Sequence, residues 1–269
     1  MSPMSTADRY GPWAIVAGAS EGIGASFSRR LAAQGINLVL VARRADPLNA
    51  LAHELRDQYG VETRAIALDL SVPGAEAELF NATAALEVGL LICNAGADEH
   101  AAWFLDVAAD EWAAMIRRNC VVPMVAAHHY GAAMVGRGRG GVLLVTSGAA
   151  WVGGARLATY GATKAFDLVL GEALWAEWHD RGVDVLSLVV GATDTPALRR
   201  LLEQQGVTLD GLADPDDVAA NGLEHLADGP TWSIGMPDGG GPSPFDGLRR
   251  RDAALAMSAG ADMTFGPRS

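Results

Sequence analysis

A short apolar run followed at once by three closely spaced glycines is the feature that most constrains the fold. Trp13–Ala17 has the continuous apolar character of a buried strand, and Gly18, Gly22 and Gly24 come directly after it. Residues 25–34 then follow a helical pattern. Strand, glycine turn and helix in this order are typical of a βαβ unit, in which backbone N–H groups at the helix N-terminus can hold a phosphate.

The same alternation of strand and helix continues along the chain. Apolar runs predict strands at 13–17, 37–42, 62–68, 89–93, 142–146, 183–190 and, weakly, 231–235. Helical patterns occupy 25–34, 46–59 (with Asp46 as its N-cap), 73–85, 110–135 (interrupted by Pro123), 159–181, a stretch capped by Asp214, and 249–259, while 235–247 reads as a loop. We therefore predict one α/β domain, a Rossmann-type doubly wound parallel sheet of about seven strands with helices on both faces.

Polar residues and glycines stand where several predicted strands end. Gly18, Arg43, Asp69, Asn94 and Ser147 each follow a strand. Ligands in open parallel sheets bind outside the carboxyl ends of the strands, so these positions predict a single binding edge.

Tyr160 and Lys164 are four residues apart on a predicted helix and therefore share one face. An ammonium one turn away stabilises a phenolate, which allows a tyrosine to exchange protons near neutral pH. Ser147 could hold a substrate oxygen beside that hydroxyl. A chance pair on a solvated helix is the alternative, but Lys164 is the only lysine among 20 basic residues, and lysine and arginine differ in donor geometry and acidity.

Composition restricts the partners. A formal net charge of −12 disfavours nucleic acid and anionic membranes as partners. The two cysteines, Cys93 and Cys120, lie in apolar surroundings and are expected to be reduced thiols of a cytoplasmic protein. No signal-peptide core or membrane span is expected. The adjacent His128 and His129 point in different directions on a helix, so no metal site is expected.

These motifs together resemble the short-chain dehydrogenase/reductase family. The resemblance extends from about Trp13 to Gly240 and sets residues 1–12 and 241–269 apart as tails. It rests on the glycine loop, on Asn94-Ala95-Gly96 after the fourth strand, on Asp69, and on the set Asn119, Ser147, Tyr160 and Lys164. The chain departs from the family with Ala17 in place of a common Thr and Val190 in place of a common Pro.

The resemblance implies an oxidoreductase that transfers a hydride between a nicotinamide and a ketone or secondary alcohol. Tyr160 would exchange the hydroxyl proton, Ser147 would orient the substrate oxygen, Lys164 would also bind the nicotinamide ribose, and Asn119 would kink its helix and support a proton-relay water. From the residues themselves, Trp151 and Leu198 could join Ser147 and Tyr160 around the substrate, and Leu198, Leu201 and Leu202 could form a lid over it. Core packing is the alternative for Trp151 and for the three leucines. The implied cofactor contacts are Gly18, Ser20, Glu21, Gly22, Ile23, Gly24, Arg43, Arg44, Asp69, Leu70, Asn94, Ala95, Gly96, Tyr160, Lys164, Gly191, Thr193 and Thr195.

The end of the second strand indicates which dinucleotide is used. An NAD site of this type places an acidic residue there, to accept hydrogen bonds from the ribose 2′-hydroxyl. This chain has Arg43 and Arg44, whose guanidinium groups can pair with a 2′-phosphate. Ser20 could also donate to that phosphate, whereas Glu21 is an acidic residue where NADP-preferring relatives often carry a basic one. We expect NADP(H) to be preferred and NAD(H) to be possible.

Two other functions remain open at this point. One is a dinucleotide-binding redox sensor without turnover, and the other is an epimerase or dehydratase that shares the Tyr-x-x-x-Lys motif. The substrate is expected to be rather apolar, for example a ketone, a steroid-like molecule or a 3-oxoacyl compound. The resemblance also implies a homodimer or homotetramer formed through the helices at 110–135 and 159–181.

Overall fold

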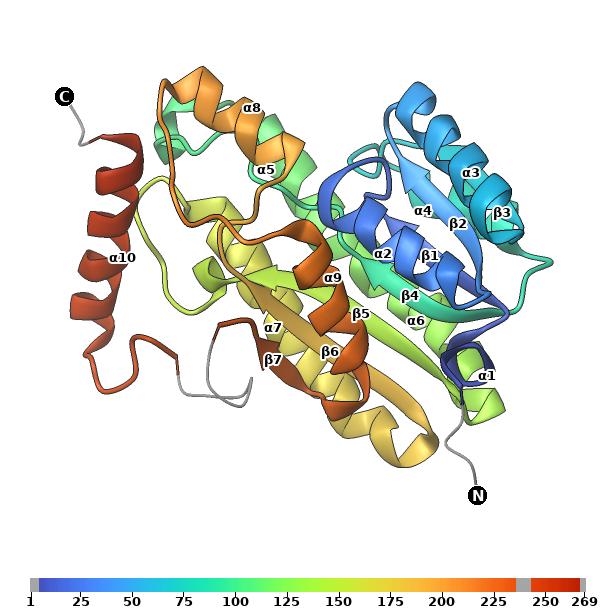
Figure 1. Ribbon diagram of the computed structural model, residues 1–269. Helices are drawn as coiled ribbons and strands as arrows, with labels where there is room; N and C mark the ends of the chain where they lie inside the picture. Colours follow the sequence, from blue (N-terminus) through green and yellow to red (C-terminus); the bar gives the residue numbers. More distant parts are fainter. Residues whose placement is uncertain (1–4, 236–242, 267–269) are drawn as a thin grey trace.

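The computed structural model describes residues 5–235 and 243–266. In this part of the chain, seven parallel strands form one sheet in the order β3-β2-β1-β4-β5-β6-β7 (Figure 1). The strands are β1 (Trp13–Ala17), β2 (Asn37–Ala42), β3 (Thr63–Ala67), β4 (Val88–Cys93), β5 (Gly140–Ser147), β6 (Val183–Val190) and β7 (Thr231–Ser233). The predicted doubly wound fold is confirmed.

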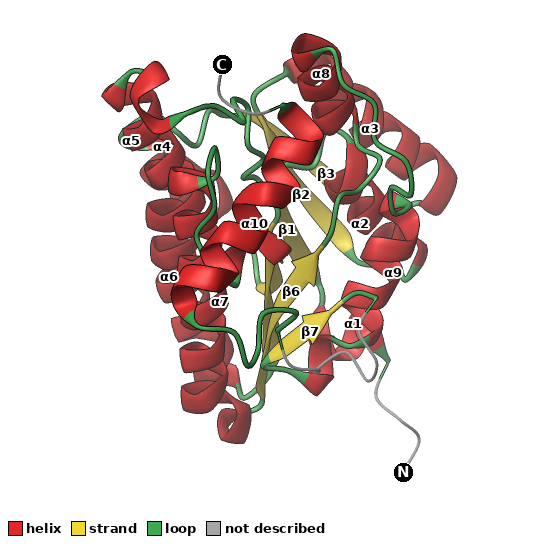
Figure 2. Ribbon diagram, turned by 90° about the vertical axis from the view of Figure 1, so that its left-hand side faces the viewer, coloured by secondary structure: helices red, strands yellow, loops and turns green. Residues whose placement is uncertain are grey.

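Helices cover both faces of this sheet (Figure 2). One face packs against α2 (Gly22–Ala33), α3 (Ala45–Tyr59) and α9 (Pro215–Glu224), and the other against α4 (Ala75–Thr83), α6 (Val122–Arg137) and α7 (Ala158–Trp178). The remaining helical segments are α1 (Thr6–Tyr10), α5 (Ala109–Ile116), α8 (Pro196–Gln205), α10 (Arg250–Phe265), the short 3₁₀ turns η1 (Phe104–Asp106), η3 (Gly148–Ala150), η4 (His179–Arg181) and η5 (Leu226–Asp228), and the π-helical turn η2 (Arg117–Val121).

The core explains why the strands are continuous apolar runs. Residues along β1 alternate between the two faces, so Ala14 and Val16 belong to one buried cluster while Ile15 and Ala17 belong to the other. Since helices cover both faces, residues 14–17 of β1 are all buried, whereas β3 at the edge of the sheet is partly exposed.

The N-cap of one helix and the interruption of another differ from the sequence prediction. The N-cap of α3 is Arg44, and Asp46 lies inside the first helical turn, where its charge still favours the positive end of the helix dipole. Pro123 does not interrupt a helix, because it stands in the first turn of α6, where its missing N–H costs nothing. The interruption comes before it, at η2. The predicted loop at 235–247 lies largely outside the described residues.

Segments outside residues 13–240 also contact this sheet and its loops. Tyr10 of α1 is buried in the core, and its hydroxyl donates to Oδ2 of Asp184 in β6 at 2.7 Å, while Arg9 binds the other carboxylate oxygen at 2.6 Å. Helix α10 lies on the opposite side of the molecule from β3 and α3 (Figure 1). The division of the chain at residues 12 and 240 stays a prediction.

Within residues 5–235 and 243–266, none of the helices has both the length and the apolar character needed to cross a membrane.

Candidate active site

A pocket of about 1230 Å³ opens at the carboxyl ends of the strands. It is lined by nearly all of the residues that the sequence singles out: Gly18, Ser20, Glu21, Gly22, Ile23, Arg43, Arg44, Leu70, Asn94, Ala95, Gly96, Ser147, Trp151, Tyr160, Lys164, Gly191, Thr193, Thr195 and Leu198. Three others, Gly24, Asp69 and Asn119, are not part of its wall.

Close backbone packing explains the glycines of the first loop. A Cβ atom on Gly24 would lie 2.1 Å from the carbonyl oxygen of Gly18, and Gly18 itself has a φ of +80°. The Nδ2 of Asn94 donates to that same carbonyl at 3.1 Å, which joins the end of β4 to the loop. Helix α2 begins at Gly22, and the side chain of its N-cap Glu21 makes no capping hydrogen bond. The first amides of α2 are therefore available to an anion such as a pyrophosphate.

Asp69 stands behind the cofactor side of the pocket. Its Oδ1 accepts from the backbone N–H and the hydroxyl of Ser71, at 2.9 and 2.6 Å. Burial opposes ionisation, yet these two hydrogen bonds hold the pKa of the Asp69 carboxyl below its usual range. The neighbouring Leu70 is the residue that lines the pocket.

Lys164 is buried beside the catalytic tyrosine predicted from the sequence. Only 4% of its surface is exposed, and its Nζ donates to the carbonyl oxygen of Val145 at 2.9 Å and to Oδ2 of Asp167 at 3.2 Å. A Cβ atom on Gly96 would lie 2.9 Å from the same Nζ, so a larger residue there would collide with the ammonium. An ammonium has three N–H donors, and two of them are used. One donor of Lys164 therefore remains for a ligand or for Tyr160.

Asp167 is the counter-ion of Lys164 and was missed by sequence reasoning. Burial disfavours its charged form, and although the ammonium of Lys164 opposes this effect, the pKa of Asp167 is raised to about 6. The spacing Lys164–Asp167, three residues apart on a helix, is a sequence signal that could have identified the pair.

Asn119 lies in the π-helical turn η2 and is fully buried. Its Nδ2 donates to the hydroxyl of Thr163 at 2.9 Å and to the carbonyl oxygen of Gly96 at 3.4 Å. Isolated π-turns are frequent at functional sites. Here the turn directs a buried amide towards the segment that surrounds Lys164, which agrees with the predicted kink of this helix.

The hydroxyl of Ser147 is available at the end of β5. Its Oγ accepts from the backbone N–H of Ala149 at 3.2 Å. The hydroxyl hydrogen remains to donate into the pocket, which Ser147 lines together with Tyr160.

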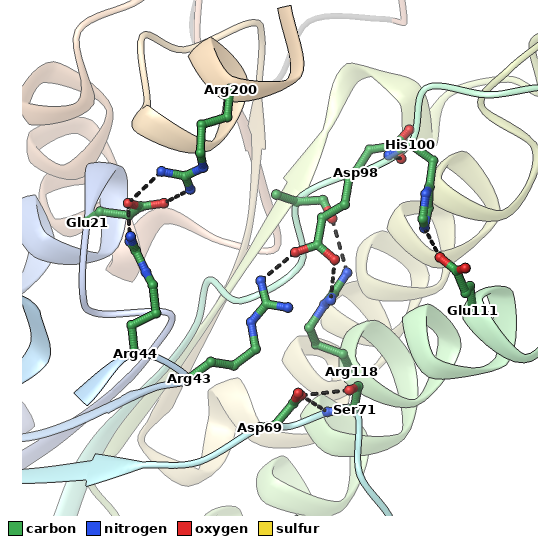
Figure 3. Close-up of polar contacts among 12 residues, drawn as sticks. Glu21, Arg43, Arg44, Asp69, Ser71, Asp98, His100, Glu111, Arg118 and Arg200 are labelled. Atoms are coloured by element: carbon green, nitrogen blue, oxygen red, sulfur yellow. Dashed lines mark hydrogen bonds and ion pairs between the residues drawn. The ribbon is translucent and has the colours of Figure 1, made fainter. Parts of the chain in front are cut away.

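The two arginines after β2 are each paired with a carboxylate (Figure 3). Arg44 binds Glu21, and Arg43 binds Glu99. The side chains of both arginines are about half exposed, and both residues line the pocket. They lie where the sequence predicted contacts to a 2′-phosphate, at the rim of the cofactor side.

Each of these carboxylates has a second arginine that sequence reasoning missed. Arg200 of α8 binds both carboxylate oxygens of Glu21. Arg118 of η2 binds Oε2 of Glu99 at 3.3 Å. Burial raises the pKa of Glu21, but the hydrogen bonds from Arg200 and Arg44 outweigh this effect and leave the pKa below its usual range. Burial also opposes ionisation of Glu99, and its pKa is lowered in the same way, by Arg118 and Arg43.

Apolar side chains form the other half of the pocket. Trp151, Leu198 and Leu201 line it, whereas Leu202 is buried in the protein and does not. A large part of this wall comes from α10, which lies in the segment that the sequence analysis sets apart as the C-terminal tail. The residues of α10 in the wall are Ala256, Met257, Gly260, Ala261, Thr264 and Phe265. Their spacing follows the helical period and was the available signal.

A few polar contacts attach α10 to the loop after β5. The backbone N–H of Ala155 donates to the hydroxyl of Ser258 at 3.0 Å, and Arg156 donates to the carbonyl oxygen of Gly266 at 2.9 Å. The Arg156 guanidinium also lies 4.9 Å from the ring centre of Trp103. Arg156 thus joins the end of α10 to the segment that precedes α5.

Comparisons with known proteins agree with this geometry. The family model described as short chain dehydrogenase matches residues 12–206. The chain is 37% identical over 205 residues to a 7beta-hydroxysteroid dehydrogenase of Collinsella aerofaciens, a match that covers 72% of this chain and 74% of the relative. It is also 32% identical over 182 residues to a human very-long-chain 3-oxoacyl-CoA reductase, covering 66% of this chain and 58% of that protein.

Solved structures give the same result. A structure from work on the stereoselectivity of 7beta-hydroxysteroid dehydrogenase superposes with a TM-score of 0.82 at 30% identity, covering 94% of this chain and 98% of the other. A short-chain dehydrogenase from Sphingobium yanoikuyae in complex with NADPH superposes with a TM-score of 0.75 at 29% identity, covering 91% and 93%. The chain belongs to the short-chain dehydrogenase family and is an NAD(P)-dependent oxidoreductase.

Proposed function

We propose that this chain interconverts a bulky, apolar ketone of steroid size and the corresponding secondary alcohol, with NADP(H) as the preferred cofactor. One observation carries the proposal: a single pocket joins Tyr160 and Lys164 to an apolar wall formed by α8 and α10. The relatives that act on hydroxysteroids and on 3-oxoacyl thioesters support a large, apolar substrate.

The proposed chemistry assigns a different task to each polar residue. The bound nicotinamide supplies the hydride for reduction, or accepts it for oxidation. Tyr160 gives its hydroxyl proton to the developing alkoxide, and Ser147 donates a hydrogen bond that fixes the carbonyl oxygen beside it. The remaining N–H donor of Lys164 stabilises the tyrosinate or binds a ribose hydroxyl. Asn119 holds the Gly96 carbonyl and Thr163 in place around Lys164.

The substrate class is tested with a panel of ketones. Reduction of a 7-oxosteroid, a long-chain 3-oxoacyl thioester and a small aliphatic ketone by the purified protein is followed by NADPH absorbance. We expect the highest kcat/KM for the steroid, because a rigid polycyclic ketone fills a large apolar pocket without losing rotamer entropy. Preference for the thioester would contradict the steroid assignment, and preference for the small ketone would contradict the role of the apolar wall.

The same panel separates the two competing functions. A redox sensor would bind the dinucleotide without any turnover. An epimerase or dehydratase would convert its substrate without net change in NADPH absorbance. The pairing of Lys164 with Asp167 beside Tyr160 supports a proton-transfer site, which a sensor does not need.

The preference for NADP(H) is supported by Arg43 and Arg44 at the end of β2 and by relatives whose structures contain NADPH or NADP. The test compares kcat/KM with NADPH and NADH in the wild type and in the double variant Arg43→Asp, Arg44→Ala. Each charge-assisted hydrogen bond contributes about 1.5–3 kcal/mol, so the ratio should fall at least about tenfold. A wild-type preference for NADH, or a ratio unchanged by the substitutions, would refute the assignment.

A homodimer or homotetramer formed through α5, α6 and α7 is part of the proposal. Three large apolar side chains on these helices are exposed: Ile116, Met124 and Val169. Light scattering on the wild type and on Val169→Glu tests this assembly. A monomeric wild type, or an assembly that the charged variant leaves intact, would contradict the proposed contact.

A further inference from the structure

Two arginines, Arg44 and Arg200, share the carboxylate of Glu21. Glu21 is the N-cap of α2 and its side chain is 23% exposed. One oxygen, Oε2, accepts from both Arg44 and Arg200, while Oε1 accepts from Arg200 alone. Figure 3 shows Glu21 between the two guanidinium groups, which approach it from opposite sides. Arg44 follows β2, whereas Arg200 belongs to α8.

This sharing presents a problem for binding a 2′-phosphate. Under the proposed NADP preference, on which this inference rests, Arg44 must turn its guanidinium to the phosphate. Glu21 competes with the phosphate for the Arg44 guanidinium. If Arg44 were the only partner of Glu21, its departure would leave a partly buried carboxylate unpaired, which costs free energy. Arg200 removes the problem because it already contacts both oxygens of Glu21. When Arg44 leaves, Arg200 remains as a two-point partner of the carboxylate.

We infer that Arg200 is a specificity-determining residue for 2′-phosphorylated dinucleotides. It stays paired with the Glu21 carboxylate and so allows Arg44 to bind the phosphate. The charges fit this role. Glu21, Arg44 and Arg200 carry a net charge of +1, so the site keeps one positive charge for the ligand in spite of an acidic residue in the glycine loop. Glu99, Arg43 and Arg118 repeat the arrangement, with one carboxylate between two arginines.

The position of Arg200 also links the two halves of the pocket. Leu198 and Leu201, which line the substrate side, lie on the same helix α8. Arg200 shares Oε2 of Glu21 with Arg44. Once a 2′-phosphate engages Arg44, the whole carboxylate is left to Arg200. NADP(H) should therefore hold α8 more firmly against the glycine loop than NAD(H) does.

The experiment measures binding of NADPH and NADH to the full chain by calorimetry, in four proteins. These are the wild type, Arg200→Gln, the double variant Glu21→Gln, Arg200→Gln, and the control Arg199→Gln. Arg199 neighbours Arg200 on α8 but pairs with the exposed Asp194, so its substitution tests for general effects on the helix.

Arg200→Gln should weaken NADPH binding about tenfold, because Arg44 must then break a charge-assisted hydrogen bond to a Glu21 carboxylate that has no substitute partner. Binding of NADH should stay nearly unchanged. The double variant should regain wild-type NADPH affinity, because the neutral amide introduced by Glu21→Gln no longer retains Arg44. Arg199→Gln should match the wild type for both cofactors. Amide hydrogen exchange in α8 should slow more with NADPH than with NADH in the wild type, and equally with both in Arg200→Gln.

Two outcomes would overturn the inference. If Arg200→Gln leaves NADPH binding unchanged, Arg200 has no role in specificity. If the double variant stays as weak as Arg200→Gln, Arg200 contacts the phosphate itself and does not act through Glu21. Failure of the proposed NADP preference would look different, because the Arg43→Asp, Arg44→Ala variant would then bind both cofactors as the wild type does.

Discussion

The cofactor side and the substrate side of the pocket are built in different ways. On the cofactor side, α2 lies so close to the backbone of the loop after β1 that Gly24 has no room for a Cβ atom beside Gly18. On the substrate side, α10 rests on the loop after β5 through side chains such as Met257 and a few hydrogen bonds. A new side chain that clashes with backbone atoms cannot be accommodated by a change of rotamer, whereas one that clashes with a flexible side chain can. The first side therefore suits an invariant ligand, and the second can be adapted to different substrates.

The largest expected effect is at Tyr160, where the two sides meet. Tyr160→Phe removes only the hydroxyl, so turnover should fall by about 10²–10⁴-fold, the usual contribution of a positioned proton donor. Binding of NADPH should change little, as measured by calorimetry. Tyr59→Phe, at the end of α3, serves as the control and should retain wild-type turnover. Near-normal turnover of Tyr160→Phe would remove Tyr160 from the proposed chemistry.

A matched pair of glycine substitutions tests the contrast directly. A Cβ atom on Gly24 would meet the Gly18 carbonyl at 2.1 Å, and one on Gly154 would meet Cγ of Met257 at 2.5 Å. Gly24→Ala should lower the free energy of unfolding by about 1–3 kcal/mol or more and abolish NADPH binding, because backbone must move. Gly154→Ala should change stability by less than about 1 kcal/mol, since the unbranched Met257 can adopt another rotamer.

Denaturant unfolding measures the free energy of unfolding, and titration with NADPH measures the affinity for the cofactor. Gly154→Ala should instead change KM for the bulky ketone, because the displaced Met257 lines the pocket. Gly136→Ala, where a Cβ atom meets nothing within 4 Å, is the control for both. Equal losses of stability and NADPH affinity in Gly24→Ala and Gly154→Ala would show that the two sides are equally rigid.

These two sides also differ in how far the sequence predicts them. Gly18, Gly22 and Gly24, and likewise Tyr160 and Lys164, are recognisable because their function depends on spacing within one local segment. The partners of Glu21 are not, since Arg200 follows it by 179 residues and only the fold brings them together. The residue pattern placed the interruption of this helix at Pro123, the more obvious helix breaker, whereas the π-helical turn lies before it at Asn119. Only the family resemblance pointed to a kink at Asn119.

A more gradual effect is expected at Asp167, where the free energy of unfolding should depend on pH. Its pKa is raised to about 6 in the folded protein, so folding favours the protonated carboxyl. The stability that this group contributes is therefore greatest below the pKa of the unfolded chain and is lost as pH rises through about 6. The free energy of unfolding of the wild type should fall relative to Asp167→Asn between about pH 4 and pH 7, by up to about 3 kcal/mol.

Denaturant unfolding at several pH values measures this difference. Asp57→Asn provides the control, because Asp57 is an exposed carboxylate on α3. A difference between wild type and Asp167→Asn that stays constant with pH would show that Asp167 remains ionised throughout and that its charge is fully compensated by Lys164.

The single lysine gives this protein an intrinsic chemical reporter. Lys164 carries the only side-chain amine of the chain, and it is 4% exposed and held by Val145 and Asp167. An amine-directed reagent can reach that nitrogen only through the pocket that Lys164 lines. The labelling rate of one peptide, measured by mass spectrometry, therefore reports access to the active site itself, and a ligand that engages Lys164 slows that rate without any engineered probe.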